Sequence, residues 1–435
     1  MYAETNSSTI EEYIMQYRIT APQTLRGTIQ LPASKSISNR ALIISALGRS
    51  TRQPQNISVC DDTDVMVKAL HDMPHIINIG AAGTAMRFLT AYLAVTPGQH
   101  IITGTERMKH RPIGILVDAL RSLGATVNYV ENEGFPPLQI EGCALEGGMI
   151  SLPGNVSSQF ISALLMTGPN MRQGLHIHLL GDIISRPYID LTLGMMRTFG
   201  ADAQWTGQQD IVVQPQPYAP TPYLIENDWS AASYWYQMVA LSADKQAEII
   251  LPGLFADSAQ GDAYVARLFA SLGVATEHFK MPDGTPAVRL SKNGKAAERM
   301  EHNFINQPDL AQTFVVTCAL MGIPFHFTGL QSLKIKETDR ITALIQEMDK
   351  LGYAIGQKND SEMFWDGTRT DCRTDCGIDT YEDHRMAMAF APAALVLPEI
   401  LVNNPQVVSK SYPQYWNTLK QVGFGILEMT QEIKE

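Results

Sequence analysis

The chain has 435 residues, of which 45% are hydrophobic and 18% are charged. This length and composition exclude a disordered chain and predict a folded protein with two domains or one large repeated architecture. The formal net charge of −11 argues against a nucleic-acid partner, and it would repel a small anion unless the binding site were locally positive.

The first 20 residues carry acidic and polar side chains where a signal peptide has an apolar segment, so we expect no export signal. The longest apolar stretch, Met386 to Leu397, contains a proline and is too short to cross a bilayer, so we expect no membrane partner. Five cysteines favour a reducing, cytoplasmic location over a disulfide framework. Cys372 and Cys376 have the spacing of half a metal site, but no second Cys/His pair at zinc spacing accompanies them, and we expect no metal.

One pattern recurs along the chain: an apolar-periodic helix, then a glycine, then an apolar residue that opens a strand. Successive glycines of this pattern are separated by 76, 73, 79 and 71 residues. They are Gly124, Gly200, Gly273, Gly352 and Gly423. Each fits the position that follows a helix, where a positive φ favours a residue without a Cβ.

A second type of helix recurs in step with the first. Its predicted starts lie near Lys35, Gly83, Ser157, Ser230, Asp309 and Asp383, at intervals of 48, 74, 73, 79 and 74 residues. Six units of two helices and short strands bury little alone and must pack together. The first interval is short, and the first helix of the glycine type, between Asp64 and Pro74, lacks its glycine. Either a strand–turn–strand segment is deleted there or the unit has diverged.

Cations stand at several predicted helix starts, beside the serine, threonine, aspartate and proline residues that helix starts favour. They are Lys35, Arg111, Arg186, Lys336 and Lys410. A cation is disfavoured at the positive end of the helix dipole unless an anion is shared between it and the free backbone N–H groups. For one such residue a solvated surface charge is the better interpretation. The set of five favours a convergent site for ligands with several phosphates or carboxylates.

Eight sequence blocks follow one another between Leu31 and Trp416. They are LPASKSISNRALIISAL, GAAGTAMRFLTA, RMKHRPIGILVDALRSLGA, SSQFISALL, SRPYIDLTLGMM, LKIKETDR, DHRMAM and SKSYPQYW. In this order they resemble the motifs of the 5-enolpyruvylshikimate-3-phosphate (EPSP) synthase family, and LKIKETDR and DHRMAM are the most specific. The resemblance implies an α/β fold, a two-domain inverted α/β barrel built from six βαβαββ repeats, here with the first repeat shortened. Domain I would comprise residues 1–33 and 227–435, and domain II residues 34–226.

The same resemblance implies the reaction: transfer of the enolpyruvyl (1-carboxyvinyl) group of phosphoenolpyruvate to the 5-hydroxyl of shikimate-3-phosphate, with release of phosphate. This is a step of the shikimate pathway towards chorismate and the aromatic amino acids. C3 of phosphoenolpyruvate is protonated, the hydroxyl attacks C2, and phosphate is eliminated. Two proton-transfer groups and a cationic lining suffice, so we expect no cofactor. We also expect a monomer whose partners are these two substrates.

The family motifs imply roles for individual residues. Asp309 would accept the hydroxyl proton, and Glu337 would serve C3 with Lys336 and Lys35 as further catalytic residues. Shikimate-3-phosphate would contact Lys35, Ser36, Arg40, Ser157, Ser158, Gln159, Ser185, Tyr188, Asp309 and Lys336. Phosphoenolpyruvate would contact Lys35, Gly83, Arg111, Gln159, Arg340, Arg385 and Lys410. Read without the motifs, Asp309 is a helix cap and Glu337 a first-turn acid. His384 is either a proton relay or a hydrogen-bonded structural residue, and Arg87 is expected to bridge carboxylates.

Ala81 and Ser332 stand where the family usually has asparagine. The sister enzyme that uses UDP-N-acetylglucosamine is disfavoured, because that family places asparagine after its N-terminal lysine and a cysteine acid in a loop. Here Ser36 follows the lysine, and the RMKHRPIG block has no cysteine. The alternative from a different functional class is a non-catalytic relative that binds shikimate-3-phosphate without turnover.

Overall fold

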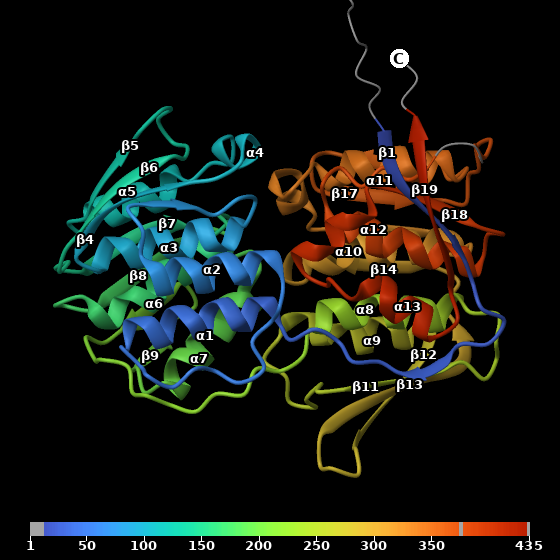
Figure 1. Ribbon diagram of the computed structural model, residues 1–435, viewed down its shortest axis with the longest axis horizontal. Helices are drawn as coiled ribbons and strands as arrows, with labels where there is room; N and C mark the ends of the chain where they lie inside the picture. Colours follow the sequence, from blue (N-terminus) through green and yellow to red (C-terminus); the bar gives the residue numbers. More distant parts are fainter. Residues whose placement is uncertain (1–12, 374–376, 433–435) are drawn as a thin grey trace, which may run out of the picture.

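The computed structural model describes residues 13–373 and 377–432, which form two lobes lying side by side (Figure 1). We define the lobes by their two hydrophobic cores. The core of the first lobe draws its residues from between Ala33 and Ile225. The core of the second lobe combines residues between Ile19 and Leu31 with residues between Trp229 and Phe424. The second lobe is therefore built from both ends of the chain.

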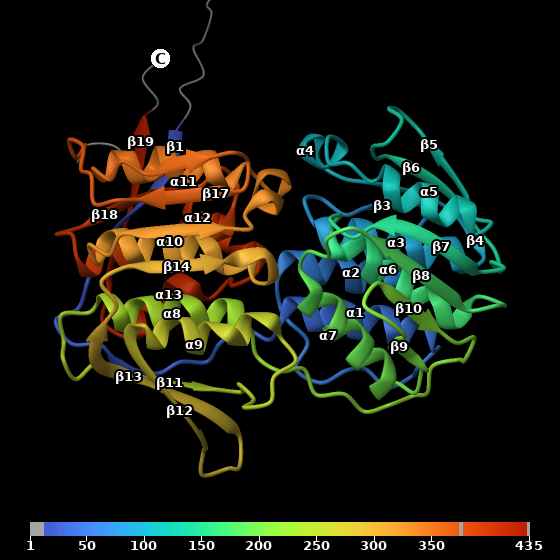
Figure 2. The same cartoon turned by 180° about the vertical axis from the view of Figure 1, so that it is seen from behind.

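Four four-stranded sheets share one topology, in which two parallel strands are followed by two antiparallel ones. In the first lobe, one sheet has the strand order β3 (Ile76–Asn78), β4 (Gly98–Thr103), β6 (Leu138–Gly142) and β5 (Thr126–Tyr129). The other has the order β7 (Gly148–Pro153), β8 (Leu175–Leu180), β10 (Asp210–Val213) and β9 (Ala203–Trp205). In the second lobe, one sheet has the strand order β2 (Arg26–Thr28), β11 (Glu248–Pro252), β13 (Pro286–Ala296) and β12 (Leu272–Lys280). The other has the order β14 (Met300–Asn303), β15 (Phe325–Thr328), β17 (Glu362–Trp365) and β16 (Gly356–Lys358). The β12–β13 hairpin protrudes from this lobe (Figure 2).

A fifth sheet joins the two ends of the chain. Strand β1 (Tyr13–Thr20) lies between β18 (Ile400–Asn403) and β19 (Gly425–Glu432) and is antiparallel to both. A parallel bridge between Ile378 and Val402 completes the arrangement seen in the other four sheets. Because β2 also pairs with β11, the first 33 residues contribute to two sheets of the second lobe.

Six helices are buried on nearly all sides, as is typical of helices inside a fold. They are α1 (Lys35–Leu47), α3 (Gly83–Val95) and α6 (Ser158–Thr167) in the first lobe, and α8 (Trp229–Leu241), α10 (Ala311–Leu320) and α12 (His384–Phe390) in the second. Six others carry a polar side: α2 (Asp61–Asp72), α5 (Gly114–Ser122), α7 (Arg186–Thr198), α9 (Val265–Ala270), α11 (Arg340–Lys350) and α13 (Tyr415–Gln421). The predicted two helices per repeat are therefore present in all six units.

Shorter helices fill the connections. They are α4 (Glu106–Lys109) and the 3₁₀ helices η1 (Gly168–Asn170), η2 (Gly261–Tyr264), η3 (Phe304–Asn306), η4 (Pro308–Leu310), η5 (Gln331–Ile335), η6 (Ala391–Leu395) and η7 (Pro405–Lys410). Across the described residues, no helix has the length and apolar character needed to traverse a bilayer.

The first repeat keeps its two helices and lacks a sheet of its own among the described residues. Its extended segments make only isolated bridges, Ala33 to Asn227 and Gln55 to Leu224. The short first interval therefore reflects missing strands. All five glycines of the repeat pattern have positive φ, between +80° and +100°, as predicted. Met73, with φ of 41°, takes the corresponding place after α2.

The two connections between the lobes lie side by side. Ala33 pairs with Asn227, and the Ser34 N–H donates to the Glu226 carbonyl at 2.8 Å. The Glu226 side chain is buried and accepts hydrogen bonds from four groups: Trp229 Nε1 (2.7 Å), Phe255 N (2.7 Å), Ser258 Oγ (2.6 Å) and Gln260 Nε2 (2.8 Å). Burial raises its pKa, and the hydrogen bonds oppose that rise. The Glu226 carboxylate therefore fixes the start of the second connection between the lobes.

We predict that Glu226→Ala destabilises the protein by about 3 kcal/mol, because it leaves several buried donors without a partner. Denaturant unfolding of the variant measures the loss. Glu298→Ala, at an exposed glutamate, is the matched control and should change stability by less than about 0.5 kcal/mol. Equal stabilities of the two variants would contradict this role of Glu226.

Candidate active site

Polar groups from both lobes meet where the lobes face each other. Tyr188 Oη donates to Asp309 Oδ2 at 3.3 Å, and Arg107 Nε donates to the Glu337 carbonyl at 3.2 Å. The Ser185 N–H donates to the Ile305 carbonyl at 2.8 Å. Each contact joins a residue of the first lobe to one of the second. The starts of α7 and α11 therefore both lie at the boundary between the two lobes.

Arg340, the first residue of α11, links three carboxylates. Its Nε and Nη2 donate to Asp383 at 2.6 and 3.4 Å, its Nη1 donates to Asp309 at 3.1 Å, and its Nη2 donates to Glu337 at 2.8 Å. The side chain is 1% exposed. A guanidinium buried this deeply is stable only when it is paired and hydrogen-bonded. Arg340 therefore fixes these acids in one cluster.

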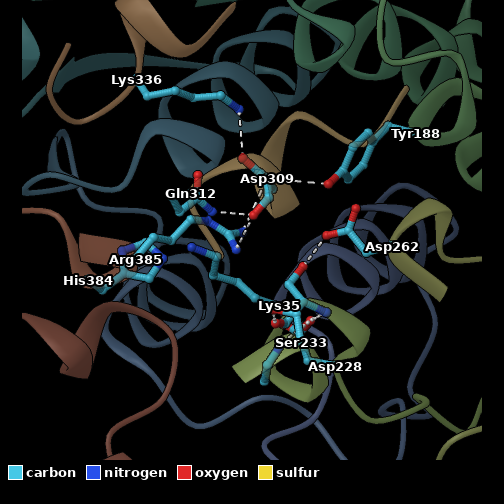
Figure 3. Close-up of polar contacts among 12 residues, drawn as sticks. Lys35, Tyr188, Asp228, Ser233, Asp262, Asp309, Gln312, Lys336, His384 and Arg385 are labelled. Atoms are coloured by element: carbon cyan, nitrogen blue, oxygen red, sulfur yellow. Dashed lines mark hydrogen bonds and ion pairs between the residues drawn. The ribbon is translucent and has the colours of Figure 1, made fainter. Parts of the chain in front are cut away.

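Asp309, in η4, faces cations on several sides (Figure 3). Besides Arg340, Lys336 Nζ lies 3.2 Å from its Oδ1 and Arg385 Nη2 lies 3.2 Å from its Oδ2. Burial raises the pKa of Asp309, but Arg385, Lys336 and Arg340 outweigh burial and hold that pKa well below its ordinary value. No backbone N–H of η4 or α10 is capped by its side chain, so the helix-cap interpretation is wrong.

Glu337 precedes α11, whose first turn contains no acidic residue, so the first-turn interpretation is also wrong. The N-cap is Asp339, which accepts from the Thr342 N–H. Burial raises the pKa of Glu337, and Arg340 and Arg111 outweigh it and keep the group ionised. A small pocket is lined by residues of both lobes: Ala81, Thr105, Arg107, Met108, Arg111, Glu337, Glu382 and Lys410.

Lys35 begins α1 and reaches this boundary from the first lobe. Its Nζ forms an ion pair with Asp62 Oδ2 at 2.9 Å. Burial lowers the pKa of Lys35, but Asp62, Cys60 and Glu337 raise it above its ordinary value. Lys35 therefore stays charged beside the acid cluster.

Gly83, the first residue of α3, provides room for Arg111. A Cβ at Gly83 would lie 2.5 Å from Arg111 Nη1. Arg111 Nε is buried and makes no hydrogen bond. The family motifs imply that Gly83 contacts phosphoenolpyruvate, and the nearest atoms to a Cβ at this position are those of Arg111. Lys410, at the end of η7, donates to the Glu382 carbonyl at 2.8 Å.

His384, the first residue of α12, is 2% exposed, and both of its ring nitrogens lack a hydrogen-bond partner. The interpretation as a hydrogen-bonded structural histidine is therefore wrong. Burial, together with Lys35 and Arg385, lowers its pKa well below the ordinary value, so the ring is neutral. Arg87 donates to the Gly83 carbonyl and to Met108 Sδ. The expectation that it bridges carboxylates is also wrong.

Apart from Asp309 and Lys336, which belong to the second lobe, the residues expected around shikimate-3-phosphate come from three helix starts of the first lobe. Ser157 caps α6, Ser158 is buried behind it, and Gln159 Nε2 donates to Thr84 Oγ1 at 3.1 Å, which places the starts of α6 and α3 together. Ser185 precedes α7 with a φ of 53°. Its left-handed conformation turns the chain into α7 beside the second lobe.

Arg40 lies deeper inside the first lobe than the other expected contacts. It donates to the Ser36 carbonyl at 2.9 Å, to Thr192 at 2.7 Å and to Ser162 at 3.2 Å. Burial lowers its pKa to about 10. These bonds hold Ser36 at the start of α1 and connect α1 to α6 and α7.

Of the five cations at predicted helix starts, Arg186 lies away from the cluster. Its guanidinium stacks on the Trp205 ring at 4.0 Å and its side chain is 40% exposed. Lys336 contacts the acid cluster, Arg111 and Lys410 line the pocket beside it, and Lys35 pairs with Asp62 close enough for Glu337 to raise its pKa.

Three acids of the site were not expected. Asp62 pairs with Lys35, and Asp383 pairs with Arg340. Asp262 accepts from Ser230 Oγ (Figure 3), and burial together with the charge of Asp309 raises its pKa to about 7. All three lie near the starts of helices, where acids also serve as caps. The residue type alone therefore does not distinguish an acid of the site from a helix cap.

The cysteine pair can be judged only in part. Cys372 is exposed, and Cys376 lies outside the described residues. Among the residues that the structure describes, no group of three or more histidine, cysteine, aspartate or glutamate side chains could hold a metal ion.

Comparison with known proteins identifies the family of this chain. The family model for EPSP synthase (3-phosphoshikimate 1-carboxyvinyltransferase) matches residues 19–77 and 72–419. A 3-phosphoshikimate 1-carboxyvinyltransferase of Bacteroides fragilis is 62% identical over 412 residues, which cover 95% of this chain and 99% of that protein. One from Aliivibrio fischeri is 36% identical over 426 residues, covering 92% and 97%.

Two solved structures have a similar fold. An EPSP synthase from Acinetobacter baumannii aligns with a TM-score of 0.76 at 20% identity, covering 95% of this chain and 100% of that one. The enolpyruvyl transferase NikO from Streptomyces tendae aligns with a TM-score of 0.71 at 15% identity, covering 97% and 100%. The predicted inverted α/β barrel fold is therefore confirmed. The chain belongs to the EPSP synthase (3-phosphoshikimate 1-carboxyvinyltransferase) family.

Proposed function

We propose that the polar cluster between the lobes is the active site of a 3-phosphoshikimate 1-carboxyvinyltransferase. The observation that supports it most is the pairing of two ionised carboxylates, Asp309 and Glu337, with the buried guanidinium of Arg340, with cations from both lobes around them. A monomeric and cytoplasmic enzyme remains a prediction.

The two substrates would lie on different sides of this cluster. Shikimate-3-phosphate would take the hydroxyls and amides at the starts of α6 and α7, with Lys35, Ser36 and Tyr188 beside its ring. Phosphoenolpyruvate would take the pocket lined by Arg111 and Lys410, with Arg385 against its carboxylate. Guanidinium groups suit carboxylate and phosphate oxygens because they donate two parallel hydrogen bonds.

Substrate binding would also prepare the acids for proton transfer. The pKa values of Asp309 and Glu337 are low because nearby cations face them. When substrate anions engage Lys336, Arg385 and Arg111, those cations stabilise the carboxylates less, and both pKa values rise. A group that exchanges protons works best with a pKa near the working pH. The anionic substrates would therefore activate the acids that act on them.

In the chemical steps, Asp309 and Glu337 would each take up one proton and release one proton. Glu337, protonated once the bound substrates have raised its pKa, delivers that proton to C3 of phosphoenolpyruvate, and the 5-hydroxyl oxygen attacks C2 while Asp309 takes the hydroxyl proton. The bond from C2 to the phosphate oxygen then breaks, phosphate leaves with the proton that Asp309 took from the hydroxyl, and Glu337 removes a proton from C3 to form the new double bond. Lys336 and Arg385 stabilise the negative charge on the departing phosphate.

Phosphate release from phosphoenolpyruvate, measured with and without shikimate-3-phosphate, tests the proposed activity. Release that depends on both substrates supports the synthase. Binding of shikimate-3-phosphate without any release would favour the non-catalytic alternative.

We predict that Glu337→Gln binds both substrates and lowers kcat by about a hundredfold or more, because the amide cannot exchange a proton with C3. Single-turnover kinetics and calorimetric binding measure the two effects separately. Glu298→Gln, at the exposed control position, should retain full turnover. Normal kcat in Glu337→Gln would rule out the proton role.

We predict that Gly83→Ala raises KM for phosphoenolpyruvate by about tenfold to a hundredfold, because the new methyl group displaces the Arg111 guanidinium. KM for shikimate-3-phosphate should change little. Gly194→Ala is the matched control, because a Cβ there would have only Arg197, at 4.0 Å, within contact range. Unchanged KM in Gly83→Ala would show that Arg111 does not bind phosphoenolpyruvate.

A further inference from the structure

The segment from Gly377 to Arg385 is held against α11 at both of its ends. At the far end from Arg340, the last turn of α11 carries Glu347, which is fully buried. Its carboxylate accepts from the Asp379 N–H at 3.0 Å, from Tyr381 Oη at 2.6 Å and from Lys350 Nζ at 2.7 Å. One glutamate thus binds both the backbone and a side chain of this segment.

Further bonds fix the same end. Lys350 Nζ also contacts Asp379 Oδ2 at 2.7 Å and the Gly377 carbonyl at 3.2 Å. Asn403 Nδ2 donates to Asp379 Oδ1 at 2.7 Å. Burial and the hydrogen bond to Glu347 raise the pKa of Tyr381, so its hydroxyl keeps its proton and acts as the donor. The carboxylate of Glu347 is therefore the acceptor on which the segment depends.

Two consecutive residues of the segment have left-handed backbone conformations without being glycine. Tyr381 has a φ of 51° and Glu382 a φ of 55°. Such a conformation is unfavourable for a residue with a Cβ, and it persists only where surrounding contacts enforce it. The contacts around this pair include those of Glu347 with Asp379 and Tyr381 and that of Arg340 with Asp383.

The left-handed pair leads directly into the site. The Glu382 carbonyl accepts from Lys410, and Asp383 then binds Arg340 and caps α12 by accepting from the Arg385 N–H at 2.9 Å. A rotation of the backbone at Tyr381 or Glu382 would thus change the positions of three cations together. None of these cations contacts Glu347.

We propose that Glu347 and Tyr381 are positioning residues that hold the left-handed pair and so align Lys410, Arg340 and Arg385 for phosphoenolpyruvate. This inference rests on the site assignment proposed above. In this proposal the two ends of α11 have different roles. Its first residue, Arg340, binds the acids, and its last turn, through Glu347, holds the backbone of Tyr381 and Glu382.

Tyr381→Phe tests the inference, because it removes one hydroxyl and keeps the ring. We expect kcat/KM for phosphoenolpyruvate to fall by about tenfold to a hundredfold, with KM for shikimate-3-phosphate unchanged, because the cations are displaced from their working positions. Tyr218→Phe is the matched control. The Tyr218 hydroxyl donates to the Met166 carbonyl at 2.8 Å in the first lobe. That variant loses one buried hydrogen bond and should keep the parental kinetics.

A second variant and a rescue separate positioning from loss of stability. Glu347→Gln should show the same kinetic pattern as Tyr381→Phe. Adding Glu382→Gly to Tyr381→Phe should recover part of kcat/KM, because glycine adopts a positive φ without steric cost. Parental kcat/KM in Tyr381→Phe and Glu347→Gln, or losses confined to thermal stability, would overturn the inference. If Glu337→Gln also kept its turnover, the site assignment itself would be at fault.

Discussion

The structure depends on one buried charge. Arg340 is held by Asp309, Glu337 and Asp383, and removing a partner from a buried ion pair costs about 3–5 kcal/mol because the remaining charge is left uncompensated. The guanidinium therefore keeps three acids close together although acids repel one another. It also belongs to α11, so the same residue places the start of this second-lobe helix and the charges that face the first lobe.

The repeated architecture explains how such a cluster arises in an acidic protein. Each unit contributes an inner helix, and the starts of α1, α3, α10 and α12 bring Lys35, Gly83, Asp309 and Arg385 to one boundary. The local excess of cations is created by topology, whereas the net charge of −11 describes the whole surface. The truncated first unit keeps α1 and α2, which carry the Lys35–Asp62 pair, and lacks only strands. Its contribution to the site is therefore preserved.

Much of the fold was predictable because its signals are local and repeated. The glycines after the helices need a positive φ, and the inner helices are buried on nearly all sides, so both features recur at regular intervals along the sequence. Specific motifs named candidate site residues such as Lys336 and Glu337, and the structure places both in the Arg340 cluster, where their catalytic roles remain a proposal. Three outcomes depend on tertiary packing and could not be predicted: Arg186 turns to Trp205, His384 lacks a hydrogen bond, and Arg87 binds a carbonyl. The left-handed pair at Tyr381 and Glu382 also gives no sequence signal, because neither residue is a glycine.

The most direct test of the account is a crystal structure with shikimate-3-phosphate and a non-reactive phosphoenolpyruvate analogue. The account predicts that the analogue's anionic groups contact Arg111, Arg385 and Lys410, and that the 5-hydroxyl of shikimate-3-phosphate lies within hydrogen-bond distance of Asp309. Ligands bound away from the boundary between the lobes, with the Arg340 cluster unchanged and unoccupied, would contradict it.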